Sequence, residues 1–341
     1  MSYKGDVRSV AVLGGGSFGT AIANIVADNG HKVGVWLRDS NLVEQCQLSG
    51  ENVKYLPGYP LNPQIQFTNE LKDLCVQAEI IFLAIPSKSF RPVLQQIKPF
   101  ISPEQILIST AKGIEADGFL LMSQVIEQEL GATNVGVLSG PNLAIEIAQR
   151  KLTATVVASK NKELMKTIQT LLSQPYFRVY ANEDVFGVEL GGALKNIYAI
   201  AAGMADALGM GENTKGMLIT RSLAEMSRMA ATLGGNPSTF LGLSGVGDLV
   251  VTCSSSLSRN YQLGYLLGEG LSLQEANTKL NQTVEGVNTV RLIQNKAKEL
   301  NLYMPLVSGM YAILFEGRDL KTVISGLMMG EHADDVEFSL R

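Results

Sequence analysis

Lysine is the residue type best suited to acid–base chemistry in this chain of 341 residues. The sequence has only two histidines: His31 precedes a predicted strand, and His332 lies in the polar C-terminal stretch. Lys112 directly follows a predicted strand, and Lys195 lies near the start of a predicted helix rich in glycine and alanine. A proton donor must reach the reacting atoms. These positions therefore favour a lysine over a histidine, with Asp, Glu and Tyr as further candidates.

Lys195 has two interpretations. A single lysine is usually a solvated surface residue. Here Val188, Leu190, Leu194 and Ile197 make much of the same helix apolar, which leaves it little solvated face. The pattern therefore favours a functional lysine.

A glycine-rich turn has the spacing of a dinucleotide-binding loop. Gly14, Gly16 and Gly19 follow an apolar run at residues 10–13 and open a helical pattern. The first glycine allows a tight bend, the second a close approach to a pyrophosphate, and the third close packing of helix on strand. The helix N-terminus offers N–H groups and the positive end of its dipole to phosphates. We expect a dinucleotide here; the alternative is an ordinary β-turn-α unit.

The second predicted strand, residues 32–37, ends in two residues that could select the cofactor. An acidic side chain at this point binds the ribose 2′-hydroxyl, whereas an arginine accepts a 2′-phosphate. Arg38 comes first, and Asp39 could instead cap the next helix. Trp36 could pack near the adenine. We therefore expect NADPH to be preferred and NADH to be tolerated.

A second anion-binding feature lies in the C-terminal half. Ser258 precedes a predicted helix that begins with Arg259 and Asn260. A serine at this position is ordinarily a helix cap. Arg259 adds a planar fork for a phosphate where the helix dipole already favours anions.

Buried strands and helices alternate through the first half of the chain. Continuous apolar runs at residues 79–84, 106–109, 135–138 and 155–158 are typical of parallel strands covered on both faces. This pattern predicts an α/β fold with an N-terminal Rossmann-type doubly wound sheet. After residue 187 only helical patterns follow, which predicts an all-helical C-terminal domain.

We therefore expect two domains, residues 1–187 for the dinucleotide and residues 188–341 for substrate and catalysis. Ligands of such sheets bind at the carboxyl ends of the strands, so we expect the helical domain to close over that edge. The last residues, 331–341, are polar and acidic and are expected to form a loose tail.

Composition excludes several classes of protein. The net charge of −4 gives no basic footprint for nucleic acid or an anionic membrane. Three scattered cysteines favour neither a disulfide framework nor a structural zinc site and suit a reducing cytoplasm. No signal peptide or membrane-spanning run is evident, and we expect no metal.

Several distinctive motifs follow one another along the chain: Gly14–Ala21, Pro86–Ser87, Ala111–Gly113, Ser139–Pro141, Leu190–Asn196, Gly247–Leu249 and Ser258–Asn260. Together they resemble the bacterial soluble NAD(P)-dependent glycerol-3-phosphate dehydrogenases over residues 8–330. The resemblance implies that dihydroxyacetone phosphate and sn-glycerol 3-phosphate are interconverted with NADP(H) or NAD(H), which feeds phospholipid synthesis. We also expect a homodimer.

The resemblance also implies roles for individual residues. Lys195 would be the catalytic acid–base residue. Substrate would be surrounded by Lys112, Gly140, Asn142, Lys195, Asp248, Ser258, Arg259 and Asn260. The cofactor would contact Gly14, Gly16, Ser17, Phe18, Gly19, Arg38, Lys112, Ala144, Arg259, Val284 and Glu285.

Two positions depart from the family pattern. Asn142 stands where a Ser or Thr is expected, and Leu143 stands where an aromatic residue is expected. Other two-domain enzymes, the β-hydroxyacid dehydrogenases and ketopantoate reductases, also use a lysine of the helical domain. The phosphate anchor around Arg259 favours the glycerol-3-phosphate dehydrogenases over these. A non-catalytic nucleotide sensor would not need a lysine–aspartate pair.

Overall fold

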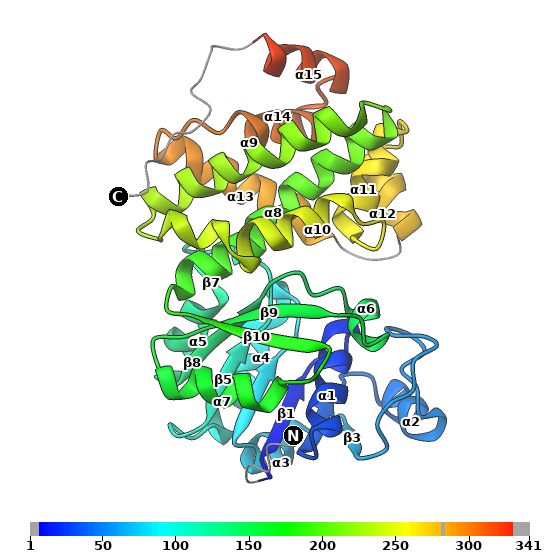
Figure 1. Cartoon of the computed structure of the whole chain (residues 1–341), viewed down its shortest axis with the longest axis vertical. Coiled ribbons are helices and arrows are strands. Elements are labelled where there is room, and N and C mark those ends of the chain that lie inside the picture. The colour runs from blue at the N-terminus through cyan, green and yellow to red at the C-terminus, as the bar shows by residue number, and fades with distance from the viewer. Residues whose placement is uncertain (1–6, 281–283, 330–341) are drawn as a thin grey trace. The chain divides into compact units, whose positions relative to one another are not determined.

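A computed structural model of the protein describes residues 7–280 and 284–329. The chain divides into two units between Val185 and Phe186 (Figure 1). The expected tail at residues 331–341 and His332 lie outside the described residues.

The N-terminal unit is built on an eight-stranded sheet with the order β10-β9-β8-β5-β4-β1-β2-β3. A separate hairpin pairs the two short strands β6 and β7. The strands are β1 (Ser9–Leu13), β2 (Lys32–Trp36), β3 (Ile65–Thr68), β4 (Ile80–Leu83), β5 (Ile106–Ser109), β6 (Ile114–Glu115), β7 (Leu120–Leu121), β8 (Val135–Ser139), β9 (Thr153–Ala158) and β10 (Phe177–Asn182).

Strand β1 lies at the point where the order of the sheet reverses. It pairs in parallel with β2 on one side and with β4 on the other. In open α/β sheets a ligand binds outside the carboxyl ends of the strands at this position. The expected Rossmann-type sheet is confirmed, and its switch point directly precedes the glycine turn.

The apolar strands suggested a sheet that is parallel throughout, but one pair of neighbouring strands is antiparallel. Strand β9 runs antiparallel to β8, with Val137 opposite Ala158 and Ser139 opposite Val156. Residues 140–152 return the chain to the sheet at the edge where β8 ends, so β9 must run back. Burial on both faces gives continuous apolarity whichever way a strand runs, so apolarity alone could not reveal this reversal.

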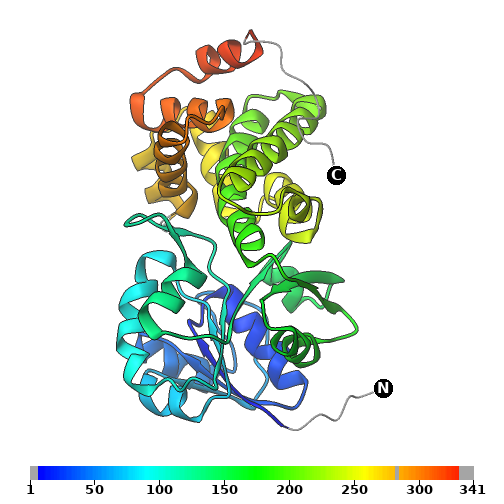
Figure 2. The same cartoon turned by 90° about the vertical axis from the view of Figure 1, so that its left-hand side faces the viewer.

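Helices cover both faces of the sheet (Figures 1 and 2). Val10 and Val12 of β1 enter one core, and Ala11 and Leu13 enter the other, because successive side chains of a strand point to opposite faces. The first core includes residues of α1 (Ser17–Asp28), α2 (Ser40–Ser49), α6 (Ala144–Ala148) and α7 (Lys162–Leu172). The second includes residues of α3 (Leu71–Gln77), α4 (Ser87–Ile97) and α5 (Met122–Leu130); η1 (Lys98–Phe100) follows α4.

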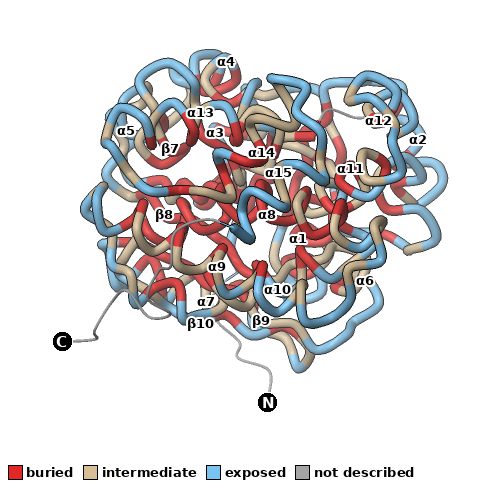
Figure 3. Tube along the Cα trace, turned by 90° about the horizontal axis from the view of Figure 1, so that it is seen from above, coloured by how far each residue is buried: buried red, intermediate tan, exposed pale blue. Residues whose placement is uncertain are grey.

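The described part of the C-terminal unit is helical, as expected. One helix, α8, is long and apolar enough to cross a membrane, but 83% of its most apolar window is buried inside the protein, as a core helix would be. Most residues of α8 are buried (Figure 3). The helices are α8 (Val185–Ala207), α9 (Gly211–Thr232), η2 (Pro237–Leu241), η3 (Leu243–Gly247), α10 (Asp248–Ser254), α11 (Arg259–Gly268), α12 (Leu273–Leu280), α13 (Glu285–Glu299), α14 (Pro305–Glu316) and α15 (Leu320–Met328).

Candidate active site

The three fixed glycines of the N-terminal turn differ in what surrounds them. Gly14 has a φ of +111°, and a Cβ there would lie 2.4 Å from the Ala84 carbonyl oxygen. A Cβ at Gly19 would lie 2.0 Å from the Gly14 carbonyl oxygen, so α1 can approach the turn only without a side chain. A Cβ at Gly16 would meet no atom within 4 Å. Packing therefore requires Gly14 and Gly19, whereas the space beside Gly16 is open to a ligand.

The start of α1 suits a phosphate group. Gly16 is its N-cap and makes no side-chain capping bond, and the first turn contains no acidic residue. The first N–H groups of a helix need an acceptor from outside the helix. The Ser17 hydroxyl donates to the Tyr55 carbonyl oxygen (2.6 Å), and Phe18 packs against the core. These residues fit the pyrophosphate of a dinucleotide.

The two residues after β2 have separate roles. Asp39 is the N-cap of α2, and its carboxylate accepts from the Asn41 N–H (3.1 Å). Arg38 is exposed, and its side chain has no partner among the described residues. The alternative that Asp39 is a helix cap is thus confirmed. It leaves Arg38 as the side chain available to a 2′-phosphate.

The sequence suggested that Trp36 could pack near the adenine, but the structure leaves its ring little exposed surface for this. The side chain is buried as a member of the second core, and its indole N–H donates to the Asn69 carbonyl oxygen (3.1 Å). As the last residue of β2, Trp36 shares the strand's burial on both faces. The expectation for Trp36 was therefore wrong.

Lys112 and the turn after β8 lie together at one edge of the sheet. The Lys112 ammonium group donates to the Gly140 carbonyl oxygen (3.1 Å). Gly140 has a φ of +143°, and a Cβ there would lie 3.2 Å from Thr155 Cα. Strands β5 and β8 are parallel neighbours, so their following loops meet at the same edge. The hydrogen bond from Lys112 thus joins these two loops at the carboxyl ends of β5 and β8.

Asn142 is held by a side-chain relay. Its Nδ2 donates to Thr155 Oγ1 (2.8 Å), which in turn donates to the Ser139 carbonyl oxygen (3.0 Å). The Asn142 Oδ1 is buried without a partner among the described residues. A Ser or Thr at this position would present a hydroxyl, which can donate, whereas the fixed amide leaves an oxygen, which can only accept. Ala144 begins α6 nearby and packs against the core.

Lys195 lies in the middle of α8 and not near its start, because the helix begins already at Val185. Its side chain is only 7% exposed and forms an ion pair with Asp248. The ammonium group also donates to Thr252 Oγ1 (2.6 Å), and the Thr252 hydroxyl donates to the Asp248 carbonyl oxygen (2.6 Å). The lysine is thus buried and oriented by two acceptors, as a proton donor must be.

Thr252 is the partner that sequence reasoning missed. Asp248 and Thr252 are four residues apart on α10, so both side chains project from one face of that helix. This spacing was readable once a helix had been assigned there. Gly245 and Gly247 just before it had obscured the helix.

Glycine also explains how α10 comes so near to Lys195. A Cβ at Gly191 of α8 would lie 2.7 Å from the Ser244 carbonyl oxygen, in the turn that leads into α10. A Cβ at Gly245 would lie 2.2 Å from the Phe240 carbonyl oxygen. The absence of side chains therefore lets the 243–247 turn lie against α8 and bring Asp248 to Lys195. The neighbouring Cys253 thiol is inert, because burial raises its pKa to about 12.

The structure places the expected phosphate anchor at the start of α11. Ser258 is the N-cap, and its Oγ accepts from the Tyr261 N–H (3.3 Å), so its side chain serves as a cap. Arg259 is the first helical residue and is exposed. Asn260 contacts Asn196, the residue after Lys195 (2.9 Å). Val284 and Glu285, expected to contact the cofactor, are the N-cap and first residue of α13.

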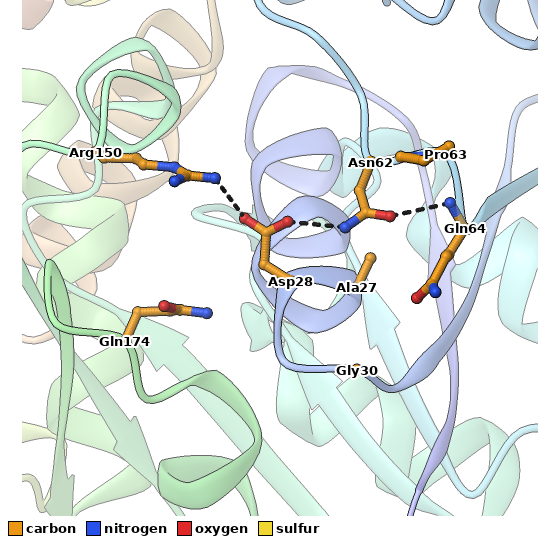
Figure 4. Close-up of a pocket in the computed structure, with 8 residues that line it drawn as sticks. All are labelled: Ala27, Asp28, Gly30, Asn62, Pro63, Gln64, Arg150 and Gln174. Atoms are coloured by element: carbon orange, nitrogen blue, oxygen red, sulfur yellow. Dashed lines mark hydrogen bonds and ion pairs between the residues drawn. The ribbon is translucent and has the colours of Figure 1, made fainter. Parts of the chain in front are cut away.

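A hollow of about 580 Å³ lies elsewhere on the N-terminal unit (Figure 4). Asp28 accepts from Asn62 Nδ2 (2.8 Å) and from Arg150 (3.2 Å), and Gln174 donates to Asn29 (2.7 Å). The hollow borders the C-terminal end of α1, whereas the phosphate-binding features lie at its N-terminal end. Three of its side chains, those of Asp28, Asn62 and Arg150, are joined by hydrogen bonds, and none of the lining residues is among the expected site residues.

Within residues 7–280 and 284–329, no cluster of three or more His, Cys, Asp and Glu side chains could hold a metal ion. Cys46, Cys75 and Cys253 are all buried and unpaired by disulfides.

Family models match nearly the whole chain. The model for the N-terminal domain of NAD-dependent glycerol-3-phosphate dehydrogenases matches residues 9–165, and the model for the C-terminal domain matches residues 184–325. The boundary between the two matches lies close to the division seen in the structure.

Individual relatives agree with these matches. The glycerol-3-phosphate dehydrogenase (NAD(P)+) of Teredinibacter turnerae is 54% identical and covers 96% of both chains. That of Ectopseudomonas mendocina is 56% identical and covers 98% of both. The crystal structure of the Coxiella burnetii glycerol-3-phosphate dehydrogenase is 37% identical, covers 95% of this chain and 99% of its own, and superposes with a TM-score of 0.91.

Proposed function

The chain belongs to the NAD-dependent glycerol-3-phosphate dehydrogenase family, and we propose that it reduces dihydroxyacetone phosphate to sn-glycerol 3-phosphate with NADPH. The observation that carries the proposal is the buried cluster of Lys195, Asp248 and Thr252. The same unit contains α11, whose first residue is Arg259. This arrangement offers a fixed proton donor and a separate cation for a phosphate. The proposal includes the reverse reaction, the oxidation of sn-glycerol 3-phosphate to dihydroxyacetone phosphate.

Lys195 supplies the proton in this proposal. A nicotinamide bound to the protein would supply the hydride, and the substrate carbonyl oxygen would then need a proton and a stabilising charge. Asp248 forms an ion pair with the buried amine, which offsets part of the cost of burying a charge. Thr252 accepts a second hydrogen and fixes the orientation of the ammonium group.

Substrate and cofactor contacts follow the positions already described. We assign the substrate phosphate to Arg259 and the N–H groups at the start of α11, where the helix dipole adds a favourable potential. Lys112, Gly140 and Asn142 are assigned to the reacting end of the ligands, and Arg38 to the 2′-phosphate of NADPH. Val284 and Glu285 at the start of α13 are assigned to the cofactor.

We also propose that the protein is a cytoplasmic homodimer whose product supplies glycerophospholipid synthesis. The three reduced cysteines are consistent with a reducing compartment. Helix α15 has no buried residue, yet it carries Leu327 and Met328, which are 38% and 64% exposed. Exposed apolar side chains of this kind mark protein interfaces. Light scattering after size-exclusion chromatography should give twice the mass of one chain. Leu327→Asp should lower the measured mass toward that of a single chain.

The test of the function is an assay of NADPH oxidation with dihydroxyacetone phosphate or ketopantoate as the only substrate. We expect oxidation with the first alone, with sn-glycerol 3-phosphate as the product. Ketopantoate represents the related two-domain reductases, which the family matches do not favour. Oxidation with ketopantoate alone would overturn the proposal. Binding of NADPH without any turnover would instead indicate a nucleotide sensor.

A further inference from the structure

The side chain of Asn260 joins three helices of the C-terminal unit. Its Oδ1 accepts from the Gly286 N–H of α13 (3.1 Å), and its Nδ2 donates to Asn196 Oδ1 of α8 (2.9 Å). Asn260 itself is the second residue of α11. The amide therefore connects the helix of the phosphate anchor with the helices that carry Lys195 and Glu285.

Hydrogen-bonding chemistry fixes the orientation of this relay. A backbone N–H can only donate, so the Asn260 atom that faces Gly286 must be the oxygen. The Nδ2 then faces Asn196, which must present its own oxygen. The second hydrogen of the Asn260 Nδ2 has no partner among the described residues. That hydrogen is available to an anion at the start of α11.

Asn260 caps α13 from outside that helix. The N-cap residue Val284 makes no side-chain capping bond. One of the first N–H groups of α13 is thus satisfied by Asn260, which takes the place of a cap side chain. A Cβ at Gly286 would lie 2.3 Å from Asn260 Oδ1 and 2.9 Å from the Asn196 carbonyl oxygen, so only glycine permits this contact.

Helix α11 is in turn fixed firmly to α8. A Cβ at Gly264 would lie 1.9 Å from the Ile200 carbonyl oxygen, and a Cβ at Gly203 would lie 2.1 Å from the Tyr261 carbonyl oxygen. The two backbones are therefore in direct contact, whereas the start of α13 is tied to this pair through the Asn260 side chain. Any ligand that orders Asn260 also orders the start of α13.

We propose that Asn260 couples the binding of the substrate phosphate to the binding of the cofactor, as a positioning residue between the start of α11 and the start of α13. The inference rests on the proposed function, which assigns the phosphate to Arg259 and the cofactor to Glu285. A phosphate at the start of α11 accepts the second Asn260 hydrogen and holds the amide. The held amide fixes the Gly286 N–H and with it the first turn of α13. By linkage, the cofactor strengthens phosphate binding by the same factor.

The experiment measures the dissociation constant of NADPH by its fluorescence, with and without saturating sn-glycerol 3-phosphate. In the wild type we expect the substrate to tighten NADPH binding by about fivefold or more. Asn260→Leu removes both hydrogen bonds at similar volume and should bring this factor close to one. Asn260→Asp keeps an oxygen for the Gly286 N–H but has no hydrogen to donate to a phosphate, so it should also bring the factor close to one. Gln262→Leu, which removes an amide of α11 bonded to Ser256, should behave as the wild type.

Hydrogen exchange gives a second readout that needs no variant. Adding sn-glycerol 3-phosphate without cofactor should slow exchange at the start of α13 in the wild type. The inference would be overturned if Asn260→Leu kept the wild-type coupling factor or if the wild type showed no coupling. It would also be overturned if sn-glycerol 3-phosphate left hydrogen exchange at the start of α13 unchanged. Failure of the proposed function looks different, because the wild type would then not oxidise NADPH with dihydroxyacetone phosphate at all.

Discussion

The environment of Lys195 determines what its amine can do. A buried ammonium group is costly without a partner, and here Asp248 and Thr252 provide one charge and one oxygen. The same contacts that offset the burial of the lysine also hold it in one orientation. Its side chain is therefore suited to donating a proton to an alkoxide formed next to it.

Lys195→Met should lower kcat by about 10²–10⁴-fold, because general acid catalysis is typically of that size. The affinity for NADPH should change little. Removing one partner of a buried ion pair also destabilises the fold by roughly 3–5 kcal/mol. The double variant Lys195→Met/Asp248→Asn should recover much of that stability and none of the activity. A single variant that keeps most of its kcat would move the acid role elsewhere, with Lys112 the next candidate.

Arg38 should determine the choice between cofactors. Charge-assisted hydrogen bonds to a phosphate contribute on the order of 1.5–3 kcal/mol. Arg38→Ala should therefore raise KM for NADPH by roughly one to two powers of ten and leave KM for NADH nearly unchanged. Asp39→Ala is the matched control: it removes the cap of α2 and should cost about 0.5–2 kcal/mol of stability without changing the cofactor ratio. An unchanged NADPH-to-NADH ratio in Arg38→Ala would show that the guanidinium points away from the cofactor.

At the scale of elements, the β1–α1 turn separates packing from ligand binding. Gly19→Ala forces a Cβ against the Gly14 carbonyl oxygen and should destabilise the protein by about 1–3 kcal/mol or more. Gly16→Ala meets no neighbour and should change stability by less than about 1 kcal/mol. Its methyl group would instead occupy the approach of the pyrophosphate, so KM for NADPH should rise. Thermal unfolding and cofactor kinetics of both variants check this, and a Gly16→Ala enzyme with wild-type KM would contradict it.

The sequence predicted elements well where one physical signal dominated. Strands such as β4 and β5 are buried on both faces, so their apolar runs were unmistakable. Strand β3 was missed, because it lies at the edge of the sheet and exposes Gln66 between buried Ile65 and Phe67. Helix α15 was missed as well.

The candidate site was predictable residue by residue, but its contacts were not. Lys195 could be singled out because its helix is apolar, yet the approach of Asp248 depends on glycines in separate segments, Gly191 and Gly245. Such tertiary packing has no local sequence signal. The same holds for the Asn142 amide, whose orientation depends on Thr155 thirteen positions away.

At the scale of the whole molecule, one buried carboxylate should make stability depend on pH. Glu225 of α9 accepts from the Tyr198 hydroxyl of α8 (3.1 Å) and from the Leu306 N–H at the start of α14 (2.6 Å). Burial raises the pKa of Glu225 from 4.5 to about 7, against the opposing effects of these hydrogen bonds and of nearby Arg228. Between these values the folded chain holds a proton that the unfolded chain has released.

The free energy of unfolding should therefore fall by about 3 kcal/mol as the pH rises from 4.5 to about 7, and this contribution should then level off. Glu225→Gln mimics the protonated form and should remove this fall, whereas Glu299→Gln, at an exposed site, should keep it. Urea unfolding across this range is the measurement. A Glu225→Gln protein with the full wild-type pH dependence would rule out this carboxylate as its source.

Recognition of a small ketone through its phosphate is tested by comparing dihydroxyacetone phosphate with dihydroxyacetone as substrates. Arg259 at the start of α11 interacts with the first substrate and has no anion to bind in the second. We expect kcat/KM to be at least about 10² higher for the phosphate ester, which corresponds to one or two charge-assisted contacts. Arg259→Ala should lose most of that difference. Equal kcat/KM for the two compounds in the wild type would contradict the account.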